Sequence, residues 1–556
     1  MAKTNATLIW NIAELLRGPF QPNQYGDVVL PFTILRRLDC ILEPTKEQVI
    51  AAYKQAQSQK IDPAVVLKSK FKLPFFNTSR WTFAKLVSDP EGVADNLNDY
   101  INRFSPNVRD VFDGFKMPDL IADLHKSGRL YLIVKEFAAV DLHPDVVSGT
   151  DMGYIFEELI RKFAESNNAA AGDHFTPREV IKLMVNVLFH SDDDALAKPG
   201  VVRTIYDPAA GTGGMLSTAY DHLVAMNHSA RPVLYGQEIN PRSYAMCKSD
   251  MIIKGQDVDN IYFGDTLTDD GFAGKHFDYL LSNPPFGVEW KSQQKKVTDE
   301  HEQRGHAGRF GPGLPRVSDG SLLFLLHLIS KMEPVKNGQG GSRLAMVLNG
   351  SPLFTGGAGS GESNIRQWII ENDLLDAIIA LPTDMFYNTG ISTYIWVLDN
   401  NKPAQRRGKV QLINAADMFG KMRKSLGSKR KELRPADIEK ICKLYDGYRN
   451  ETGTDERPAL SKVFKGEEFG YSTITVERPL QLRFTPTEDN IEAVLASKTV
   501  EKLKAAEQDA VRTALTGLIG WEYQDRDGFT TDLKDALHKA GMRTPPAPLI
   551  KAIWTT

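Results

Sequence analysis

Segments typical of buried strands alternate with turns and amphipathic segments through the middle of the chain. The strand Val201 to Tyr206 is followed by a glycine-rich turn, and Leu216 to Met226 then has the pattern of a helix. A second strand, Pro232 to Gln237, ends in Glu238, and a third acidic strand end lies at Gly264-Asp265. This order predicts an α/β fold with a doubly wound sheet, in which ligands bind at the carboxyl ends of the strands.

The turn after the first strand has the sequence Asp207-Pro208-Ala209-Ala210-Gly211-Thr212-Gly213-Gly214. Glycines in such a turn let the backbone approach a nucleotide-like cofactor, and Glu238 follows at about the separation at which an acidic side chain meets ribose hydroxyls. The sequence contains no G-x-x-x-x-G-K-[ST], so the phosphate-binding loop of an ATPase is not indicated. An acidic, lysine-poor site favours a cationic cofactor over a pyrophosphate.

The next strand, Phe277 to Ser282, must stop at Pro284 and Pro285, because proline offers no backbone N–H to a sheet. The amide oxygen of Asn283 and the carbonyl of Pro284 can accept both hydrogens of an exocyclic amino group, while Phe286 stacks on the ring that carries it. The sequence therefore predicts a site for an amino-bearing base. The alternative is a turn that only ends the strand and whose Phe packs.

A helix is predicted to begin near residue 176 and to run to about Leu188. Thr176 can serve as its N-cap, Pro177 suits its first position, and Glu179 can complete a capping box. Phe175 precedes the helix, where an aromatic ring either packs as a hydrophobic staple or faces a ligand.

After residue 320 the alternation of helices and strands continues to about residue 398, which predicts a largely parallel sheet. The intervening segment Gly287 to Gly320 is long, glycine-rich and charged, and is expected to be a loop. Loops of this length are usually functional or disordered. Contact with nucleic acid and a solvated loop both remain open for this segment.

The regions on either side have other patterns. From Leu8 to about Gly149 the pattern is helical, with a helix Val28 to Leu42 that is expected to carry Arg36 and Arg37 on its polar side. This region is either an all-helical packing domain or one that clamps DNA or a partner.

Beyond residue 400 the chain becomes basic. Lys402 to Arg407 is expected to be a basic linker, and Lys421 to Lys431 is strongly basic. Glu492 to Leu518 has the pattern of one long amphipathic helix, which forms a core or docks on a partner subunit. We therefore predict a helical N-terminal domain (1–150), a catalytic domain (151–420) and a mainly helical, partner-docking region (421–556).

Composition limits the possible functions. The formal net charge is -3, so any nucleic-acid surface must be local or supplied by a partner. The three cysteines, Cys40, Cys247 and Cys442, form no C-x-x-C pair, and no metal site is predicted. The most apolar run, Ser321 to Ile329, is too short to span a membrane. We expect a cytoplasmic protein that does not bind membranes.

Three of these motifs together resemble those of S-adenosylmethionine-dependent adenine methyltransferases. The chain closely resembles the modification subunits of type I restriction-modification systems, over roughly residues 5 to 400. Asn283-Pro284-Pro285-Phe286 is similar to the catalytic motif of that family, the turn 207–214 to its cofactor loop, and Phe175-Thr176-Pro177 to its cofactor aromatic motif. Their order is that of the gamma arrangement of amino-methyltransferases. Ala210 departs from the family pattern, in which cysteine is common.

The resemblance implies a Rossmann-like methyltransferase domain that transfers a methyl group from S-adenosylmethionine to N6 of a flipped-out adenine in double-stranded DNA. It implies that Asn283, Pro284, Pro285 and Phe286 are catalytic. The cofactor would be bound by Phe175, Thr176, Pro177, Asp207, Gly211, Thr212, Gly213, Gly214, Glu238 and Asp265.

Partners also follow from the resemblance. They would be a separate specificity subunit that supplies the DNA target, a second modification subunit, and a restriction subunit with nuclease and translocase activity. Three other functions stay open at this point. The chain could be a protein glutamine methyltransferase, which also uses an Asn-Pro-Pro-aromatic site, an RNA adenine methyltransferase, or a scaffold that binds the cofactor only to gate a restriction partner.

Overall fold

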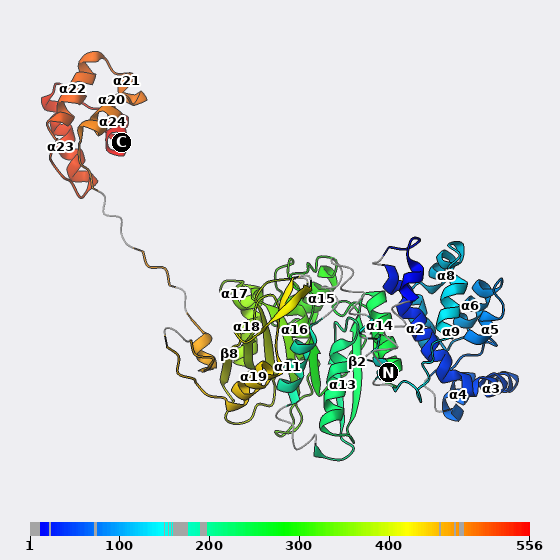
Figure 1. Ribbon diagram of the computed structural model, residues 1–556. Helices are drawn as coiled ribbons and strands as arrows, with labels where there is room; N and C mark the ends of the chain where they lie inside the picture. Colours follow the sequence, from blue (N-terminus) through cyan, green and yellow to red (C-terminus); the bar gives the residue numbers. More distant parts are fainter. Residues whose placement is uncertain are drawn as a thin grey trace. The chain divides into compact units, whose positions relative to one another are not determined.

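The computed structural model describes residues 12–21, 24–71, 75–148, 151–153, 155–156, 158–159, 176–189, 197–387, 389–426, 428–454, 458–471, 474–477 and 483–556. The chain divides into two compact units, Met1–Gly470 and Tyr471–Thr556, which are described separately (Figure 1). The C-terminal region predicted from residue 421 spans parts of both units.

Among the described residues, one sheet of nine strands forms the centre of the first unit, in the order β11-β8-β6-β7-β5-β4-β1-β2-β3. The strands are β1 (Val202–Asp207), β2 (Arg231–Glu238), β3 (Ile261–Phe263), β4 (Tyr279–Ser282), β5 (Arg343–Asn349), β6 (Leu375–Ala380), β7 (Thr393–Asp399), β8 (Lys409–Asn414) and β11 (Ser461–Lys465). The predicted α/β class is confirmed. The sheet is mixed, because β7 runs antiparallel to both β5 and β6, and β11 runs antiparallel to β8.

The strand order reverses between β1 and β4. From β1 the chain proceeds outward to β2 and β3, and from β4 it proceeds in the other direction to β5. All four neighbouring pairs in this half of the sheet are parallel, so their carboxyl ends share one edge. The connections that leave β1 and β4 diverge at this edge and open a crevice between them.

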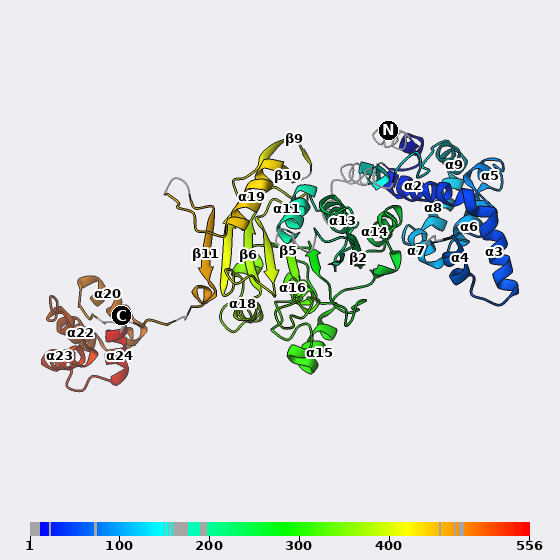
Figure 2. The ribbon, with the colours of Figure 1, turned by 90° about the horizontal axis from the view of Figure 1, so that it is seen from below.

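Helices cover both faces of the sheet (Figure 2). One face carries α11 (Arg178–Phe189), α13 (Gly214–Met226), α14 (Pro241–Ile253) and α19 (Pro435–Gly447), and the other carries α16 (Ser321–Ser330) and α18 (Gly361–Glu371). Successive strand residues point to opposite faces. Tyr279 and Leu281 accordingly lie in one hydrophobic core, and Leu280 between them lies in the other.

The segment 287–320 is an ordered insert. It contains α15 (Gln294–Arg304), and its buried side chains include Trp290 and Phe310, which are 3% and 0% exposed. Arg309 binds Glu300 at 2.7 Å within the insert. The alternative of a solvated loop is therefore wrong, because these aromatic side chains join the hydrophobic core on one face of the main sheet.

The N-terminal region is helical where it is described, as predicted. Its helices are α2 (Tyr25–Leu42), α3 (Lys46–Ser58), α4 (Pro63–Phe71), α5 (Phe83–Val87), α6 (Val93–Asn102), α7 (Pro106–Gly114), α8 (Met117–Lys126) and α9 (Leu130–Ala138). The region packs on α14, where Asp110 accepts hydrogen bonds from Lys248 at 2.6 Å and from Tyr244 at 2.9 Å. A Cβ at Gly114 would lie 2.8 Å from the carbonyl oxygen of Pro241, so glycine permits this close approach.

Two predictions about basic residues are wrong. Arg37 is 2% exposed rather than on a polar face, and its guanidinium donates to the carbonyls of Leu142 and Val147. The segment Lys402 to Arg407 is not a linker, because Lys402 and Arg406 are buried beside β6 and bind Asp373 and Asp376. In both places, carboxylates or carbonyls distant in the sequence satisfy the buried cation.

The basic stretch 421–431 forms most of a two-stranded antiparallel ribbon separate from the main sheet. Its strands are β9 (Gly420–Leu426) and β10 (Lys429–Glu432), and Lys421 lies opposite Lys431. Figure 2 shows the ribbon beside α11 and α19.

The second unit is helical, but the long helix predicted for Glu492 to Leu518 is wrong. The chain instead forms α20 (Glu488–Leu495), α21 (Lys498–Glu501), α22 (Ala505–Thr516), α23 (Arg526–Lys539) and α24 (Ala547–Thr555). Ser497 and Lys504 have extended backbones that start new helices. The breaks let Val494, Val500 and Val511 enter one core, which a straight helix could not do.

In the described part of the chain, no helix is both long enough and apolar enough to cross a membrane.

Replacing Asp376 tests how much the buried ion pairs stabilise the first unit. It is 1% exposed and accepts hydrogen bonds from Arg406 at 2.9 Å and from the Tyr445 hydroxyl at 2.5 Å. Asp376→Asn keeps the shape but leaves Arg406 as an uncompensated buried cation. We expect the free energy of unfolding of this unit to fall by about 3 kcal/mol, measured by urea denaturation of the full chain.

The matched control is Glu439→Gln, which removes a carboxylate from an exposed pair with Lys443. Exposed pairs contribute little to stability, so its unfolding midpoint should equal that of the wild type. Equal midpoints for both variants would show that the Asp376 cluster does not stabilise the sheet.

Candidate functional site

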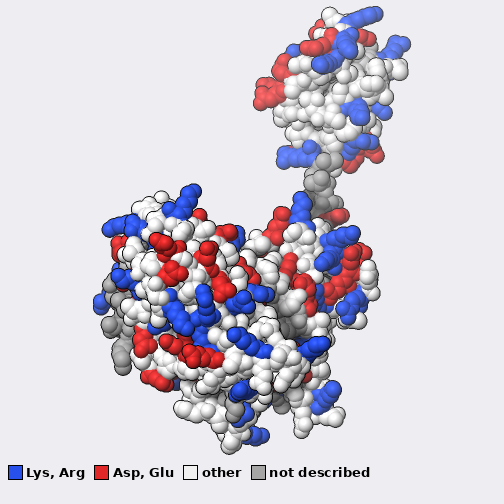
Figure 3. All heavy atoms as spheres, turned by 90° about the vertical axis from the view of Figure 1, so that its right-hand side faces the viewer, with Lys and Arg blue, Asp and Glu red and all other residues white. Residues whose placement is uncertain are grey.

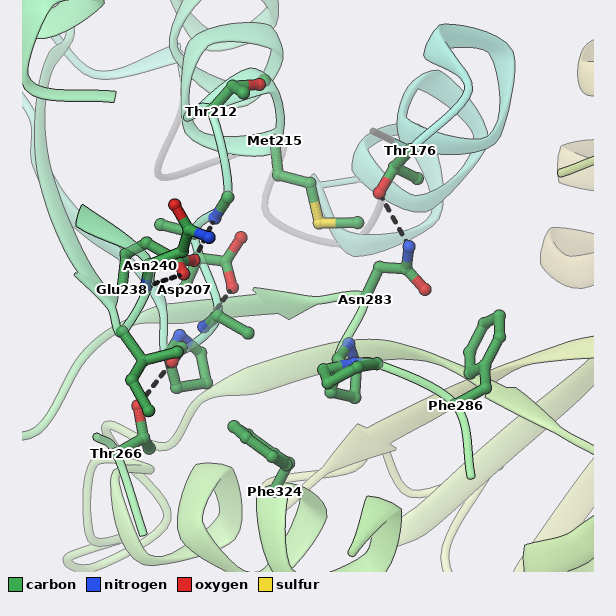
Figure 4. A pocket seen from close by; sticks show the side chains of 18 of the residues that line it. Thr176, Asp207, Thr212, Met215, Glu238, Asn240, Thr266, Asn283, Phe286 and Phe324 are labelled. Atoms are coloured by element: carbon green, nitrogen blue, oxygen red, sulfur yellow. Dashed lines mark hydrogen bonds between the residues drawn. The ribbon is translucent and has the colours of Figure 1, made fainter. Parts of the chain in front are cut away.

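A cavity of about 620 Å³ lies at the carboxyl edge of the sheet, where β1 and β4 diverge. It is lined by the glycine turn after β1, the residues after β2 and β3, and the Asn-Pro-Pro-Phe turn after β4 (Figure 4). Motifs that are far apart in the sequence thus face one space.

The cavity brings together most of the residues singled out from the sequence. Those that line it are Thr176, Asp207, Gly211, Thr212, Gly214, Glu238, Asp265, Asn283, Pro284, Pro285 and Phe286. Pro177 and Gly213 are not part of the lining, and Phe175 lies outside the described residues. Their predicted roles, like those of the lining residues, stay predictions.

Gly213 shapes the turn from behind. Its φ of 85° lies in the left-handed region, and a Cβ there would come within 3.0 Å of the Cys247 sulfur. Glycine is therefore required both for the backbone conformation and for the close packing of α13 against α14. The result is a tight turn that presents Gly211 and Thr212 to the cavity.

Glu238 links the turns that follow β1 and β2. One carboxylate oxygen accepts the backbone N–H of Gly211 at 2.8 Å, and the other accepts that of Asn240 at 2.7 Å. The residue is only 7% exposed, so the two bonds hold its carboxylate in one orientation. Each oxygen retains a lone pair for a ligand hydroxyl.

Asp207 is the most buried acid of the site, at 2% exposed. Its Oδ1 accepts hydrogen bonds from the Ala209 N–H and the Ser282 hydroxyl, both at 3.0 Å. Burial raises the pKa of this carboxyl to about 7, although these two hydrogen bonds act to lower it. Asp207 therefore changes its charge near neutral pH, and a cationic ligand beside it would favour the ionised form.

Asp265 is fixed by its own turn and by the insert. It accepts the backbone N–H of Leu267 and the side-chain amide of Gln293, both at 2.9 Å. Arg309 of the insert also donates to the carbonyls of Thr266 and Leu267, at 2.7 Å and 3.0 Å. The 287–320 segment thus builds one wall of the cavity.

The side-chain amide of Asn283 is oriented by Thr176. Its nitrogen donates to the Thr176 hydroxyl at 2.9 Å. Its oxygen is buried and has no hydrogen-bond partner among the described residues. Figure 4 shows that oxygen turned away from Thr176, on the side of Phe286. Because a buried acceptor without a partner is unfavourable, this atom indicates where a ligand donates.

The predicted capping box at the start of α11 is wrong. Thr176 and Glu179 make no hydrogen bond to each other's backbone in the described structure; Thr176 binds Asn283, and Glu179 pairs with Lys429. Both side chains are thus engaged by distant segments, whose positions the local sequence does not reveal.

Several apolar side chains of the cavity were not predicted from the sequence. Phe386 packs edge-on against Phe286 with ring centroids 5.8 Å apart, and Ile391 and Phe324 also line the space. Phe386 and Ile391 belong to the loop after β6, which carries no recognisable motif. Ile239, next to Glu238, also lines the cavity and is 58% exposed. Its position could have been predicted, because it is an apolar residue directly after an acidic strand end.

No group of three or more His, Cys, Asp or Glu side chains among the described residues has the arrangement of a metal site. The chemistry of the cavity is that of buried carboxylates at one end and an amide oxygen beside aromatic rings at the other. The first suits a polar ligand with cationic groups, and the second suits a flat ring that carries an amino group.

Comparison with known proteins assigns a family to this arrangement. Residues 147–476 match the model of the N-6 DNA methylase family, and residues 6–137 match that of the HsdM N-terminal domain. The chain is 29% identical over 468 residues to the type I restriction enzyme MjaIX methylase subunit of Methanocaldococcus jannaschii, covering 81% of this chain and 77% of that protein.

Two further relatives agree with this match. The HindI methylase subunit of Haemophilus influenzae is 29% identical over 320 residues, which are 57% of this chain and 65% of that subunit. The crystal structure of the type I restriction-modification methyltransferase subunit from Streptococcus thermophilus has the same fold, with a TM-score of 0.63 at 24% identity. That match covers 84% of this chain and 97% of the other.

The family model spans more than half of the chain and includes every turn that lines the cavity. The chain therefore belongs to the N-6 DNA methylase family.

Proposed function

We propose that this chain transfers the methyl group of S-adenosylmethionine to N6 of an adenine in double-stranded DNA, as the modification subunit of a type I restriction-modification complex. The observation that carries the proposal is the buried, unpartnered amide oxygen of Asn283 beside Phe286. Family membership and the type I methylase subunits among its relatives support DNA as the substrate, rather than a protein amide.

The acidic end of the cavity fits S-adenosylmethionine, which carries an ammonium and a sulfonium. Glu238 would bind the ribose hydroxyls, Asp265 the adenine amino group, and Asp207 with Gly211 and Gly213 the methionine end. Thr212 and Gly214 complete the turn around it. The cofactor supplies a methyl group that its sulfonium already activates, so the protein needs to supply alignment rather than a strong base.

At the other end, the Asn283 oxygen and the Pro284 carbonyl would accept the two N6 hydrogens of the target adenine. These bonds draw the nitrogen lone pair out of conjugation with the ring and direct it toward the cofactor. Thr176 holds the Asn283 amide in the orientation that this requires, since it takes the amide N–H. Pro285 stiffens the turn, because its ring fixes the backbone.

The target base must leave the duplex, because a stacked adenine cannot enter a cavity at the edge of a sheet. Phe286 would stack on the flipped base and offset part of the lost stacking, and Phe386 supports its ring.

The proposed function also requires other subunits. A separate specificity subunit would supply target recognition, a second modification subunit would join the complex, and a restriction subunit with nuclease and translocase activity would act with it. The second unit, with its own core, is a candidate docking element for these partners.

The first test is expression of this chain alone and together with the specificity subunit encoded beside it. We expect N6-methyladenine in host DNA, measured by mass spectrometry, only when both are present. Methylation by the chain alone would show that it recognises DNA without a partner. No methylation in either case would overturn the proposal.

The second test is Asn283→Ala in that complex. Loss of the acceptor should reduce the methylation rate by at least about 100-fold, while the affinity for S-adenosylmethionine, measured by calorimetry, stays unchanged. The control is Asn414→Ala, which removes an amide at the same edge of the sheet but outside the cavity, where it caps Ala416. A fully active Asn283→Ala variant would contradict the catalytic role.

The third test uses the pKa of Asp207, which burial raises to about 7. Below this pH the carboxyl is neutral and above it is anionic, so affinity for the cationic cofactor should rise as the pH rises. Between about pH 6 and about pH 8 we expect the dissociation constant to fall about tenfold, measured by calorimetry. Asp207→Asn should flatten the profile. An unchanged profile in the variant would show that another group titrates.

A further inference from the structure

The basic ribbon of β9 and β10, together with the two residues that follow it, holds seven of the chain's Lys and Arg residues. They are Lys421, Arg423, Lys424, Lys429, Arg430, Lys431 and Arg434, and the only acidic residue between 420 and 434 is Glu432. The whole chain carries a formal charge of -3, so this concentration of cations is local.

Part of this charge has partners within the protein. Lys429 is 3% exposed, pairs with Glu179 of α11, and donates to the Met385 carbonyl at 3.0 Å. Lys431 donates to the Thr383 hydroxyl at 3.0 Å, and Arg434 pairs with Asp437 at 2.8 Å. These residues fix the ribbon in place.

The rest of the described charge has none. Lys421, Arg423 and Arg430 are exposed, and no carboxylate within the described part of the chain pairs with them. Lys421 lies directly opposite Lys431, whose ammonium is 3.7 Å from the Asp384 carboxylate, so Lys421 is the cation of this pair without a carboxylate partner in the described structure. Exposed cations of this kind attract a polyanion.

The ribbon also adjoins the base end of the cavity. The Ser428 N–H donates to the Tyr387 carbonyl, and the Arg430 N–H donates to the Asp384 carbonyl, both at 2.9 Å. This same loop contributes Phe386 to the cavity wall, where it contacts Phe286. The unpaired cations are therefore attached to the segment that would surround a flipped base.

The face drawn in Figure 3 has a different arrangement of charge. On the face in Figure 3, Lys and Arg side chains are interspersed with Asp and Glu. Mixed charge of this kind gives no net attraction to a phosphate backbone.

We propose that Lys421, Arg423 and Arg430 bind backbone phosphates of the DNA next to the target adenine. The proposal rests on the function proposed above. These contacts would carry no sequence information, and would instead hold the duplex at the cavity while the base is flipped. A double-stranded DNA is the occupant, because the ribbon is bound to the loop that carries Phe386, and the phosphates that flank a flipped base would lie nearest to that loop.

The test is a triple variant, Lys421→Gln, Arg423→Gln and Arg430→Gln, in the complex with the specificity subunit. Each phosphate contact contributes about 0.9 to the slope of log K against log salt concentration, so the slope should fall by about 2.7. Binding of a labelled duplex, followed by fluorescence anisotropy, should weaken by more than about tenfold at physiological salt. The affinity for S-adenosylmethionine should not change.

The control removes the same charge from the amino-end edge of the nine-stranded sheet, which is the edge opposite the cavity. Lys198, Arg231 and Lys409 are exposed near the amino ends of β1, β2 and β8. Their replacement by Gln should leave the salt slope close to that of the wild type. If the triple variant does not fold, the single variant Arg423→Gln replaces it. Its slope of log K against log salt concentration should fall by about 0.9.

Three results would overturn the proposal. One is a wild-type slope in a folded triple variant, and the second is an equal loss of slope in the control. The third is failure of a folded triple variant to copurify with the specificity subunit, which would make the ribbon a protein-docking surface. Failure of the proposed function would look different, since the wild-type complex itself would then not methylate DNA.

Discussion

The register between β1 and β4 determines the geometry of the whole site. Their backbone pairing involves only Ile205 with Tyr279 and Tyr206 with Leu280, whereas β1 pairs with β2 along six positions. Side chains hold the pair at both ends: Thr204 donates to Asp278 at the amino end, at 2.8 Å and 2.7 Å, and Ser282 donates to Asp207 at the carboxyl end. A slip of one residue would turn Leu280 out of its core and break both contacts.

This register brings two otherwise independent turns to a fixed separation. The glycine turn begins at Asp207, and the Asn-Pro-Pro-Phe turn begins just after Ser282, so the hydrogen bond between these two residues links their starting points. Carboxylates of the cavity lie at or just after the ends of β1, β2 and β3, and the amide oxygen of Asn283 follows β4. Under the proposed function, the alignment of the cofactor with the base is set by the sheet register.

Much of the fold could be predicted from the sequence because its signals are local. The strand, glycine turn and helix from Val201 to Met226 appear within two residues of the predicted bounds, as β1 and α13. The acidic end of β2 and the proline stop after β4 depend only on residue type and order. The turns they define meet in one cavity because parallel neighbouring strands must end at one edge.

What could not be predicted depends on contacts between distant segments. The sequence around Thr176 suggests a helix cap, but the hydroxyl binds Asn283, 107 residues away. The sequence predicts Arg37 on the surface, but in the structure its guanidinium donates to the carbonyls of Leu142 and Val147. The prediction of one helix from Glu492 to Leu518 is wrong for a related reason. Its apolar residues pack into one core only because the chain breaks into shorter helices. Local pattern gives the elements, and tertiary contacts decide how polar groups are used.

The loop that follows β6 shows how these levels combine. Its residues have no motif, yet Phe386 contacts Phe286 in the cavity, while the carbonyls of Asp384 and Tyr387 accept backbone N–H groups from the basic ribbon. Lys429 extends the same connection to Glu179 in the first turn of α11, close to Thr176 and hence to the Asn283 amide. Backbone hydrogen bonds and a ring contact thus link the basic ribbon to the aromatic wall of the cavity, and Lys429 links it separately to the first turn of α11.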